Sequence, residues 1–150
     1  METMHNLAMA YDGLGKYEKS LLLYEEVLDK RTTLFGKTHF GTLRTMYQIS
    51  KAYVRCGEYR RAIVVSEELL EKEREIFGEN HKNTLDTMNT LALAYLRLDE
   101  YEKAISLYEK ELEEWSKFLD EKHPIIMIVK KNLSYAYRRM GEHKSSNDNI

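Results

Sequence analysis

The chain has 150 residues, of which 43% are hydrophobic and 32% charged, and its net charge at pH 7 is −2. These values are typical of a folded domain with a core. They argue against disorder and against general affinity for nucleic acid or anionic membranes. One proline, seven glycines and an abundance of Glu, Leu, Lys and Ala favour an all-α fold. No apolar run approaches the roughly 18 residues of a membrane span, and the single cysteine, Cys56, fits a cytoplasmic location.

The sequence repeats itself with a period of 42 residues. A tyrosine marks the period, and it recurs as Tyr11, Tyr53, Tyr95 and Tyr137. Before each tyrosine, selected positions follow the spacing of three and four residues that places side chains on one side of an α-helix. In the third repeat these positions hold Met88, Leu91 and Ala92. A period of this length indicates an array of helical repeats, each stacked on its neighbours.

Each repeat is predicted to contain an A helix followed by a B helix. The A helices are predicted at about residues 2–14, 43–56, 85–98 and 126–140. The B helices are predicted at about residues 17–35, 59–77 and 101–119. Gly15, Gly57 and Gly141 suit the left-handed conformation that ends a helix. Thr42 and Thr84 are predicted to cap the A helices that follow them.

A histidine recurs in the loops between repeats, as His39, His81 and His123. Successive repeats hold these residues at least a helix-packing distance of about 8–10 Å apart. A zinc ion needs its nitrogen ligands within about 2.1 Å, so the three histidines are not expected to share a metal. We expect each one to make a hydrogen bond near the start of the next helix, and we predict neither metal nor cofactor.

The sequence offers no candidate for catalysis. The glycines are dispersed, so there is no phosphate-binding loop. Cys56 is expected to be a small packed side chain. The third B helix carries an acidic series that is interpreted as a solvated outer face, Glu109, Glu111, Glu113 and Glu114. We therefore predict that the chain is not an enzyme.

The pattern resembles the tetratricopeptide repeat (TPR). In the third repeat it comprises Met88, Leu91, Ala92, Tyr95, Asp99-x-Tyr101, Ala104 and Tyr108. The 42-residue period and the linker ending in His123-Pro124 are similar to those of kinesin-light-chain-like repeats. The resemblance implies an all-α, right-handed α-solenoid of antiparallel helix pairs, with about three and a half repeats in one array. The predicted repeats are 1–41, 42–83, 84–125 and a partial repeat, 126–150. This incomplete end favours a segment of a longer array.

The face of each A helix opposite the packing stripe is free for function. The resemblance implies that these positions line a concave groove, and they hold seven basic residues and three acidic ones, Glu2, Asp12 and Asp86. The predicted peptide-binding groove comprises Arg44, Tyr47, Lys51, Val54, Arg55, Asn89, Leu93, Leu96, Arg97, Lys131, Tyr135, Arg138 and Arg139.

A groove that combines apolar residues with Arg and Lys suits an extended peptide whose hydrophobic anchor is flanked by acidic residues. The resemblance further implies that asparagines such as Asn89 bond the peptide backbone. The first hypothesis is therefore a protein–protein interaction scaffold. The alternative is an architectural spacer or oligomerisation segment of a larger signalling or motor-adaptor protein, which could self-associate through its exposed repeat ends. Neither hypothesis involves nucleic acid or a membrane.

Overall fold

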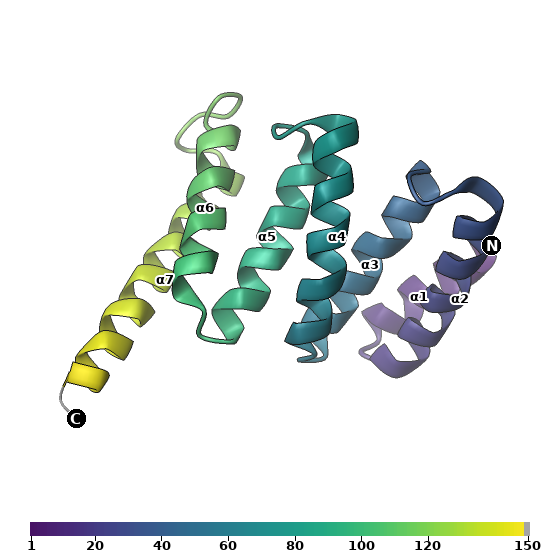
Figure 1. Cartoon of the computed structure of the whole chain (residues 1–150), viewed down its shortest axis with the longest axis horizontal. Coiled ribbons are helices and arrows are strands. Elements are labelled where there is room, and N and C mark those ends of the chain that lie inside the picture. The colour runs from purple at the N-terminus through teal and green to yellow at the C-terminus, as the bar shows by residue number, and fades with distance from the viewer. Residues whose placement is uncertain (149–150) are drawn as a thin grey trace. The chain divides into compact units, whose positions relative to one another are not determined.

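The computed structural model describes residues 1–148. These residues form seven α-helices and no strand, which confirms the predicted all-α fold (Figure 1). The helices are α1 (Glu2–Gly13), α2 (Tyr17–Phe35), α3 (Phe40–Arg55), α4 (Tyr59–Phe77), α5 (Lys82–Arg97), α6 (Tyr101–Trp115) and α7 (Pro124–Asp148). No helix within residues 1–148 combines the length and the apolar character that crossing a membrane requires.

The chain divides into two compact units, Met1–Lys72 and Glu73–Ile150, which we call the first unit and the second unit. In the first unit α2 packs against both α1 and α3. In the second unit α6 packs against both α5 and α7. Consecutive helices within each unit run in opposite directions, as expected for stacked A–B pairs (Figure 1).

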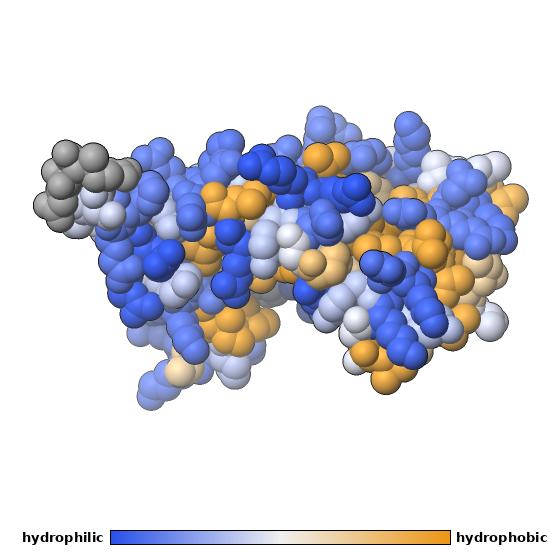
Figure 2. All heavy atoms as spheres, turned by 90° about the horizontal axis from the view of Figure 1, so that it is seen from below, coloured by the Kyte–Doolittle hydropathy of each residue, from blue (hydrophilic) through white to orange (hydrophobic). Residues whose placement is uncertain are grey.

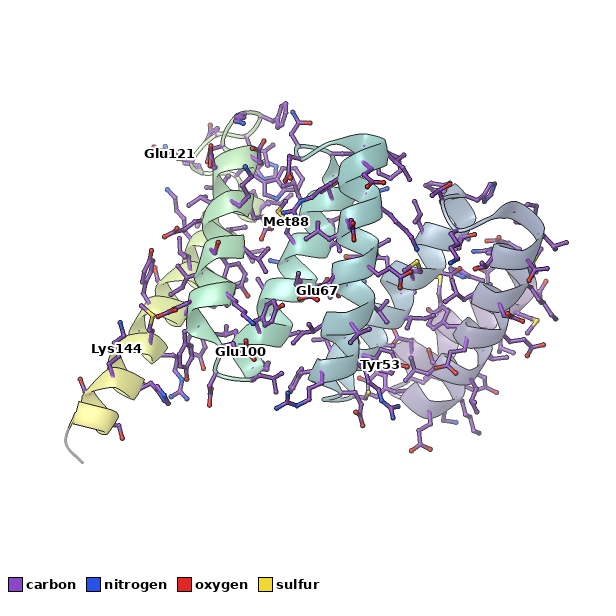
Figure 3. The ribbon with its side chains drawn as sticks, in the orientation of Figure 1. Tyr53, Glu67, Met88, Glu100, Glu121 and Lys144 are labelled. Atoms are coloured by element: carbon purple, nitrogen blue, oxygen red, sulfur yellow. The ribbon has the colours of Figure 1, made fainter. Side chains whose placement is uncertain are left out.

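The predicted packing stripe is buried where a repeat has neighbours. Met88, which is labelled in Figure 3, is fully buried, and Leu91, Ala92 and Tyr95 are buried with it. On α1 the counterpart of Leu91 is Leu7, which is 46% exposed. The stripe is therefore a property of the repeat, and its burial depends on the helices beside it.

The loop histidines start the helices that follow them, as predicted. The ring nitrogen Nδ1 of each histidine accepts a hydrogen bond from the backbone N–H two residues later. The donors are Gly41 at 3.0 Å from His39, Asn83 at 3.1 Å from His81, and Ile125 at 3.2 Å from His123. These caps explain why α3 and α5 begin at Phe40 and Lys82, earlier than the predicted starts at residues 43 and 85.

The prediction that Thr42 and Thr84 cap the A helices was wrong. Both residues lie inside their helices, and each hydroxyl donates a 2.8 Å hydrogen bond to the carbonyl oxygen of a preceding loop glycine, Gly36 or Gly78. The two threonines therefore fasten the loop to the helix, while the histidines satisfy the free amides at the helix start.

Two further helix ends differ from the prediction. Gly15 and Gly57 have φ of 76° and 81°, the expected left-handed conformation, but Gly141 lies inside α7, which continues to Asp148. Residues 141–146 of this extension are exposed, and the ring of His143 is 5.7 Å from that of Tyr101 at the start of α6. The other difference is that α6 ends at Trp115 instead of residue 119.

Candidate functional site

In the first unit the predicted groove residues all lie on α3. They are Arg44, Tyr47, Lys51, Val54 and Arg55. Arg55 is exposed and the other four are half-buried, so each can be reached from solvent. The ammonium group of Lys51 lies 5.2 Å from the centre of the Tyr47 ring, a cation–π contact.

Two of these cations are already paired with acidic residues of α1. Arg55 forms an ion pair with Asp12, whose side chain is buried. Arg44 binds Glu2 at 2.6 Å, and Glu2 also binds the buried Arg31 at 2.8 Å. The acidic partners are themselves members of the predicted groove. Carboxylates of α1 therefore neutralise two of the three cations that were predicted to line the groove on α3.

His5, another residue of the α1 groove face, is buried under the same charges. Its ring meets that of Tyr24 edge-on at 5.5 Å. Burial, together with the nearby guanidinium groups of Arg44 and Arg31, lowers the pKa of His5 to about 4. The imidazole is therefore neutral at physiological pH.

In the second unit the predicted residues lie on α5 and α7. They are Asn89, Leu93, Leu96 and Arg97 on α5, and Lys131, Tyr135, Arg138 and Arg139 on α7. The expectation that Leu96 lies on an open face was wrong, because its side chain is only 6% exposed. Its neighbours Ala94 and Tyr95 are buried as well, so α5 is enclosed around more of its circumference than a single packing stripe requires.

Three of the four cations in the predicted groove of this unit differ from the arginines of α3, while the fourth, Arg139, forms an ion pair with Glu142 at 3.3 Å. Arg97, Lys131 and Arg138 are exposed, and none of the three forms an ion pair with a carboxylate among residues 1–148. The Arg138 guanidinium lies 5.3 Å from the centre of the Tyr135 ring. The one acidic groove residue of this unit, Asp86, is held by Lys82 at 2.6 Å.

Helices α5 and α7 also carry accessible apolar side chains. Tyr135 is 38% exposed and Ile128 is 56% exposed, both on α7, while Leu93 on α5 is half-buried. The face drawn in Figure 2 likewise shows apolar patches bordered by hydrophilic side chains. Exposed cations and accessible apolar side chains, which are in contact at Arg138 and Tyr135, are the features that a hydrophobic anchor flanked by carboxylates needs.

The acidic series on α6 does not form one solvated face, so that prediction was wrong. Glu111 and Glu114 are buried, whereas Glu109 and Glu113 are exposed. Glu114 is compensated by Lys117 at 3.0 Å. The position of Glu111 in the 42-residue register corresponds to Val27 and Leu69, which are both buried. Alignment of the B helices would have shown that a charged residue stands in an otherwise apolar column.

Two buried carboxylates of the second unit have no cationic partner among the described residues. Glu111 on α6 and Glu73 on α4 are each only 3% exposed. Glu111 accepts a 3.2 Å hydrogen bond from the side-chain amide of Asn89, and Glu73 accepts one from the hydroxyl of Thr87. Burial raises the pKa of each carboxyl to about 7, and the negative charge of Asp86 contributes to both shifts.

The described residues provide no metal site, since no group of three His, Cys, Asp or Glu side chains within residues 1–148 could hold an ion. Cys56 is exposed, contrary to the packed position expected for it, because it lies just beyond the last turn of α3. Its thiol donates to the backbone carbonyl of Tyr53 at 3.4 Å.

Comparison with known proteins agrees with this architecture. The tetratricopeptide repeat family model matches residues 1–72, 52–113 and 87–148. The chain is similar to a Podosopora anserina protein described as a kinesin light chain with nearly identical TPR-like repeats. The TM-score is 0.86 at 22% identity, covering 96% of this chain and 68% of that one.

The chain is also similar to BtubC (BKLC) from P. vanneervenii. Here the TM-score is 0.84 at 18% identity, covering 97% of this chain and 58% of that one. The Sgt2 TPR domain from Aspergillus fumigatus is a more distant likeness, with a TM-score of 0.66 at 17% identity, covering 96% of this chain and 81% of that one. A comparison with curated proteins returned no match. At these identities the likeness to solved structures concerns the fold.

Proposed function

The chain belongs to the tetratricopeptide repeat family, and we propose that it is a non-catalytic scaffold that binds an extended peptide of a partner protein. TPR repeats generally serve as protein-interaction scaffolds. The comparison with the Sgt2 TPR domain supports the same fold. A cytoplasmic location is part of the proposal, because the only cysteine is a free thiol.

The binding residues are proposed to be those of α5 and α7, which we call the α5/α7 group: Asn89, Leu93, Arg97, Lys131, Tyr135 and Arg138. One observation carries this choice. The arginines of α3 are paired with Asp12 and Glu2, whereas the cations of the α5/α7 group form no ion pair with any carboxylate in the part of the chain that the structure describes, residues 1–148. A carboxylate of the ligand can therefore bind the α5/α7 cations without breaking an internal ion pair.

The ligand is proposed to carry a large apolar residue between acidic ones. Tyr135 and Leu93 would contact the apolar anchor, and the nearby cations would bind the flanking carboxylates by charge-assisted hydrogen bonds. Because these cations are exposed, much of their effect should appear as fast, salt-sensitive association.

The experiment uses a fluorescein-labelled peptide with one tryptophan flanked by Asp and Glu residues, and follows its anisotropy as the full chain is added. We expect the triple variant R97E/K131E/R138E to weaken binding at least about tenfold and to flatten the salt dependence. K130E is the matched control, because Lys130 is an exposed neighbour of Lys131 outside the α5/α7 group. Unchanged affinity in the triple variant, or no binding of any peptide in an acidic series, would overturn the proposal.

A second candidate function is self-association through α1. Leu7 and, on the same side at the end of the helix, Leu14 are exposed by 46% and 71%, although the counterparts of Leu7, Ile49 and Leu91, are buried. An apolar stripe without a packing partner favours contact with another repeat. The molar mass measured by light scattering should then rise with concentration and return to the monomer value in L7E. A monomer at every concentration would exclude this function.

A further inference from the structure

We propose that Glu111 is the positioning residue of Asn89. Through the hydrogen bond between them, Glu111 determines whether the carbonyl oxygen or the NH₂ group of the Asn89 amide faces the main chain of a bound peptide. When Glu111 gains a proton, the amide turns and presents the other group. The proposal rests on the peptide binding proposed above. It deepens that function by assigning a role to a buried residue of α6, away from the exposed cations.

The geometry joins an accessible amide to a buried carboxyl. Asn89 is half-buried on the groove side of α5, and its Nδ2 donates to Oε2 of Glu111 at 3.2 Å. An ionised carboxylate can only accept hydrogen bonds, so it takes the N–H end of the amide. The carbonyl oxygen Oδ1 of Asn89 then remains for a ligand, where it can accept from a main-chain N–H.

A proton on Glu111 inverts this arrangement. A protonated carboxyl has an O–H donor, which is satisfied by the carbonyl oxygen of Asn89. The amide of Asn89 then turns its NH₂ toward the ligand side and can donate to a main-chain carbonyl. The same two residues therefore present either an acceptor or a donor, and the proton decides between them.

The buried position of Glu111 brings the pKa of its carboxyl close to physiological pH. Its carboxyl replaces the apolar side chain found at Val27 and Leu69, and burial raises its pKa to about 7. Both protonation states are consequently populated near neutral pH. Burying a carboxylate without a cationic partner costs free energy. A hydrophobic side chain would therefore stabilise this position better, so packing alone does not explain why the residue is Glu111.

The surroundings of Glu111 contain no cation that would hold it ionised. On α5, Asp86 is paired with Lys82 and its charge raises the pKa of Glu111, and Arg97 forms no ion pair with Glu111 among the described residues. On α4, the acid Glu73 is influenced by the same Asp86. On α6 itself the neighbouring groups are Tyr108 and the indole of Trp115, both buried. The charged groups of the facing helix α7 include Lys130, Lys131, Arg138 and Arg139. None of these four pairs with Glu111 among the described residues.

The chain contains its own control in Glu73. Glu73 matches Glu111 in burial, and its pKa is raised to the same value of about 7 with the same contribution from Asp86. Its hydrogen-bond partner is Thr87, which is fully buried and cannot reach a ligand. The variant E73Q therefore removes a titrating carboxyl of the same kind and leaves the contact between Asn89 and Glu111 in place.

The first experiment follows the Asn89 side-chain amide by nitrogen-15 NMR in the unliganded full chain from pH 5.5 to 8.5. We expect the two amide protons to titrate with a midpoint near 7, shared with the carboxyl carbon of Glu111. The titration should persist in E73Q and disappear in E111Q. An amide that does not titrate in the wild type, or that still titrates in E111Q, would overturn the proposal.

The second experiment measures binding of the fluorescein-labelled acidic tryptophan peptide, with its main chain N-methylated at one position at a time. At one position, N-methylation should weaken binding at pH 8 by about 2- to 10-fold, which is the contribution of one net hydrogen bond. The same N-methylation should have no effect at pH 6. E111Q should remove this pH difference. If no acidic peptide binds, the proposed function fails and the NMR result still decides the role of Glu111. If peptides bind and no position shows the pH difference, only the positioning role fails.

Discussion

The two units are built from the same repeat, and they differ in how some of their buried charges are compensated. The first unit pairs its buried groups, Asp12 with Arg55 and Arg31 with Glu2. The second unit places Glu73 and Glu111 in its interior with only neutral hydrogen-bond donors, Thr87 and Asn89. The first unit thus pairs two of its groove-face arginines internally, whereas Arg97, Lys131 and Arg138 of the second unit form no ion pair with a carboxylate among residues 1–148.

This difference shows that the 42-residue register determines which positions pack, but does not determine how the charged side chains of each unit are paired. Ion pairs inside the first unit offset the desolvation of its charges and reduce what its α3 surface offers to a partner. In the second unit the burial of two unpaired carboxylates lowers stability at neutral pH. Such a cost is common at positions where function, more than packing, selects the residue.

The largest expected effect is a loss of stability of the second unit as the pH rises. The folded-state pKa of Glu111, about 7, lies above the ordinary value of 4.5, so the folded state binds the proton more tightly. The unfolding free energy should therefore fall between pH 5 and pH 8, by about 2–3 kcal/mol for each such carboxyl. Urea unfolding followed by the fluorescence of Trp115, the only tryptophan, measures this change. E111Q should remove the share due to Glu111, and a slope unaltered in E111Q would contradict the assignment.

The first unit should respond to pH in the opposite direction. The pKa of buried His5 is lowered to about 4 from an ordinary value of 6.5, so its stabilising contribution is present above pH 6.5 and is lost as the pH falls toward 4. Between pH 7 and pH 5 the first unit should lose about 2 kcal/mol. Hydrogen exchange of peptides from α1 and α2, corrected for intrinsic rates, tests this. Protection that is constant or increases toward pH 5 would show that His5 does not control this unit.

Removing one arginine from each unit should sharpen the contrast. R55A leaves Asp12 buried without its cation and should destabilise the chain by about 1–3 kcal/mol, the lower part of the range applying because Arg55 is partly exposed. R97A removes an exposed cation without an ion-pair partner among residues 1–148 and should change stability by less than about 0.5 kcal/mol. Both variants can be compared in thermal unfolding followed by circular dichroism. Equal losses would mean that the two units do not differ in this respect.

A feature that the two units share should have the same effect in both. His39 in the first unit and His81 in the second cap their helices in the same way, and each ring stacks on a phenylalanine, at 4.7 Å and 4.4 Å. H39A and H81A should each cost about 1 kcal/mol, as for other N-cap replacements. The urea midpoints of the two variants measure this. Clearly different losses would show that the electrostatic contrast extends to the helix starts.

Much of the fold could be predicted because it depends on periodic residues. The stripe of Met88, Leu91, Ala92 and Tyr95 gave the helix and its buried side, and the recurring loop histidines gave the hydrogen bonds at the helix starts. The helix ends were harder to predict. Thr42 is a good cap by residue type, and Gly141 is a good helix end, but His39 provides the hydrogen bond at the start of α3, and α7 continues through Gly141 to Asp148.

The candidate site could be predicted only in outline, because charge pairing depends on side-chain contacts between helices. Helical spacing placed Arg55 and Asp12 on the same kind of face, yet it could not reveal that they bind each other. Burial of Leu96 and Glu111 likewise follows from how neighbouring helices enclose α5 and α6. The register did contain one usable signal, the acidic residue aligned with Val27 and Leu69.

The most direct test of the proposed binding is to map the fluorescein-free acidic tryptophan peptide onto the nitrogen-15-labelled chain by NMR. The contrast between paired and unpaired cations predicts that the strongest shift changes fall on α5 and α7, including Arg97, Lys131 and Arg138, while the ion-paired arginines of α3 change little. Shift changes centred on Arg44 and Arg55, or spread evenly over all basic residues, would contradict the account.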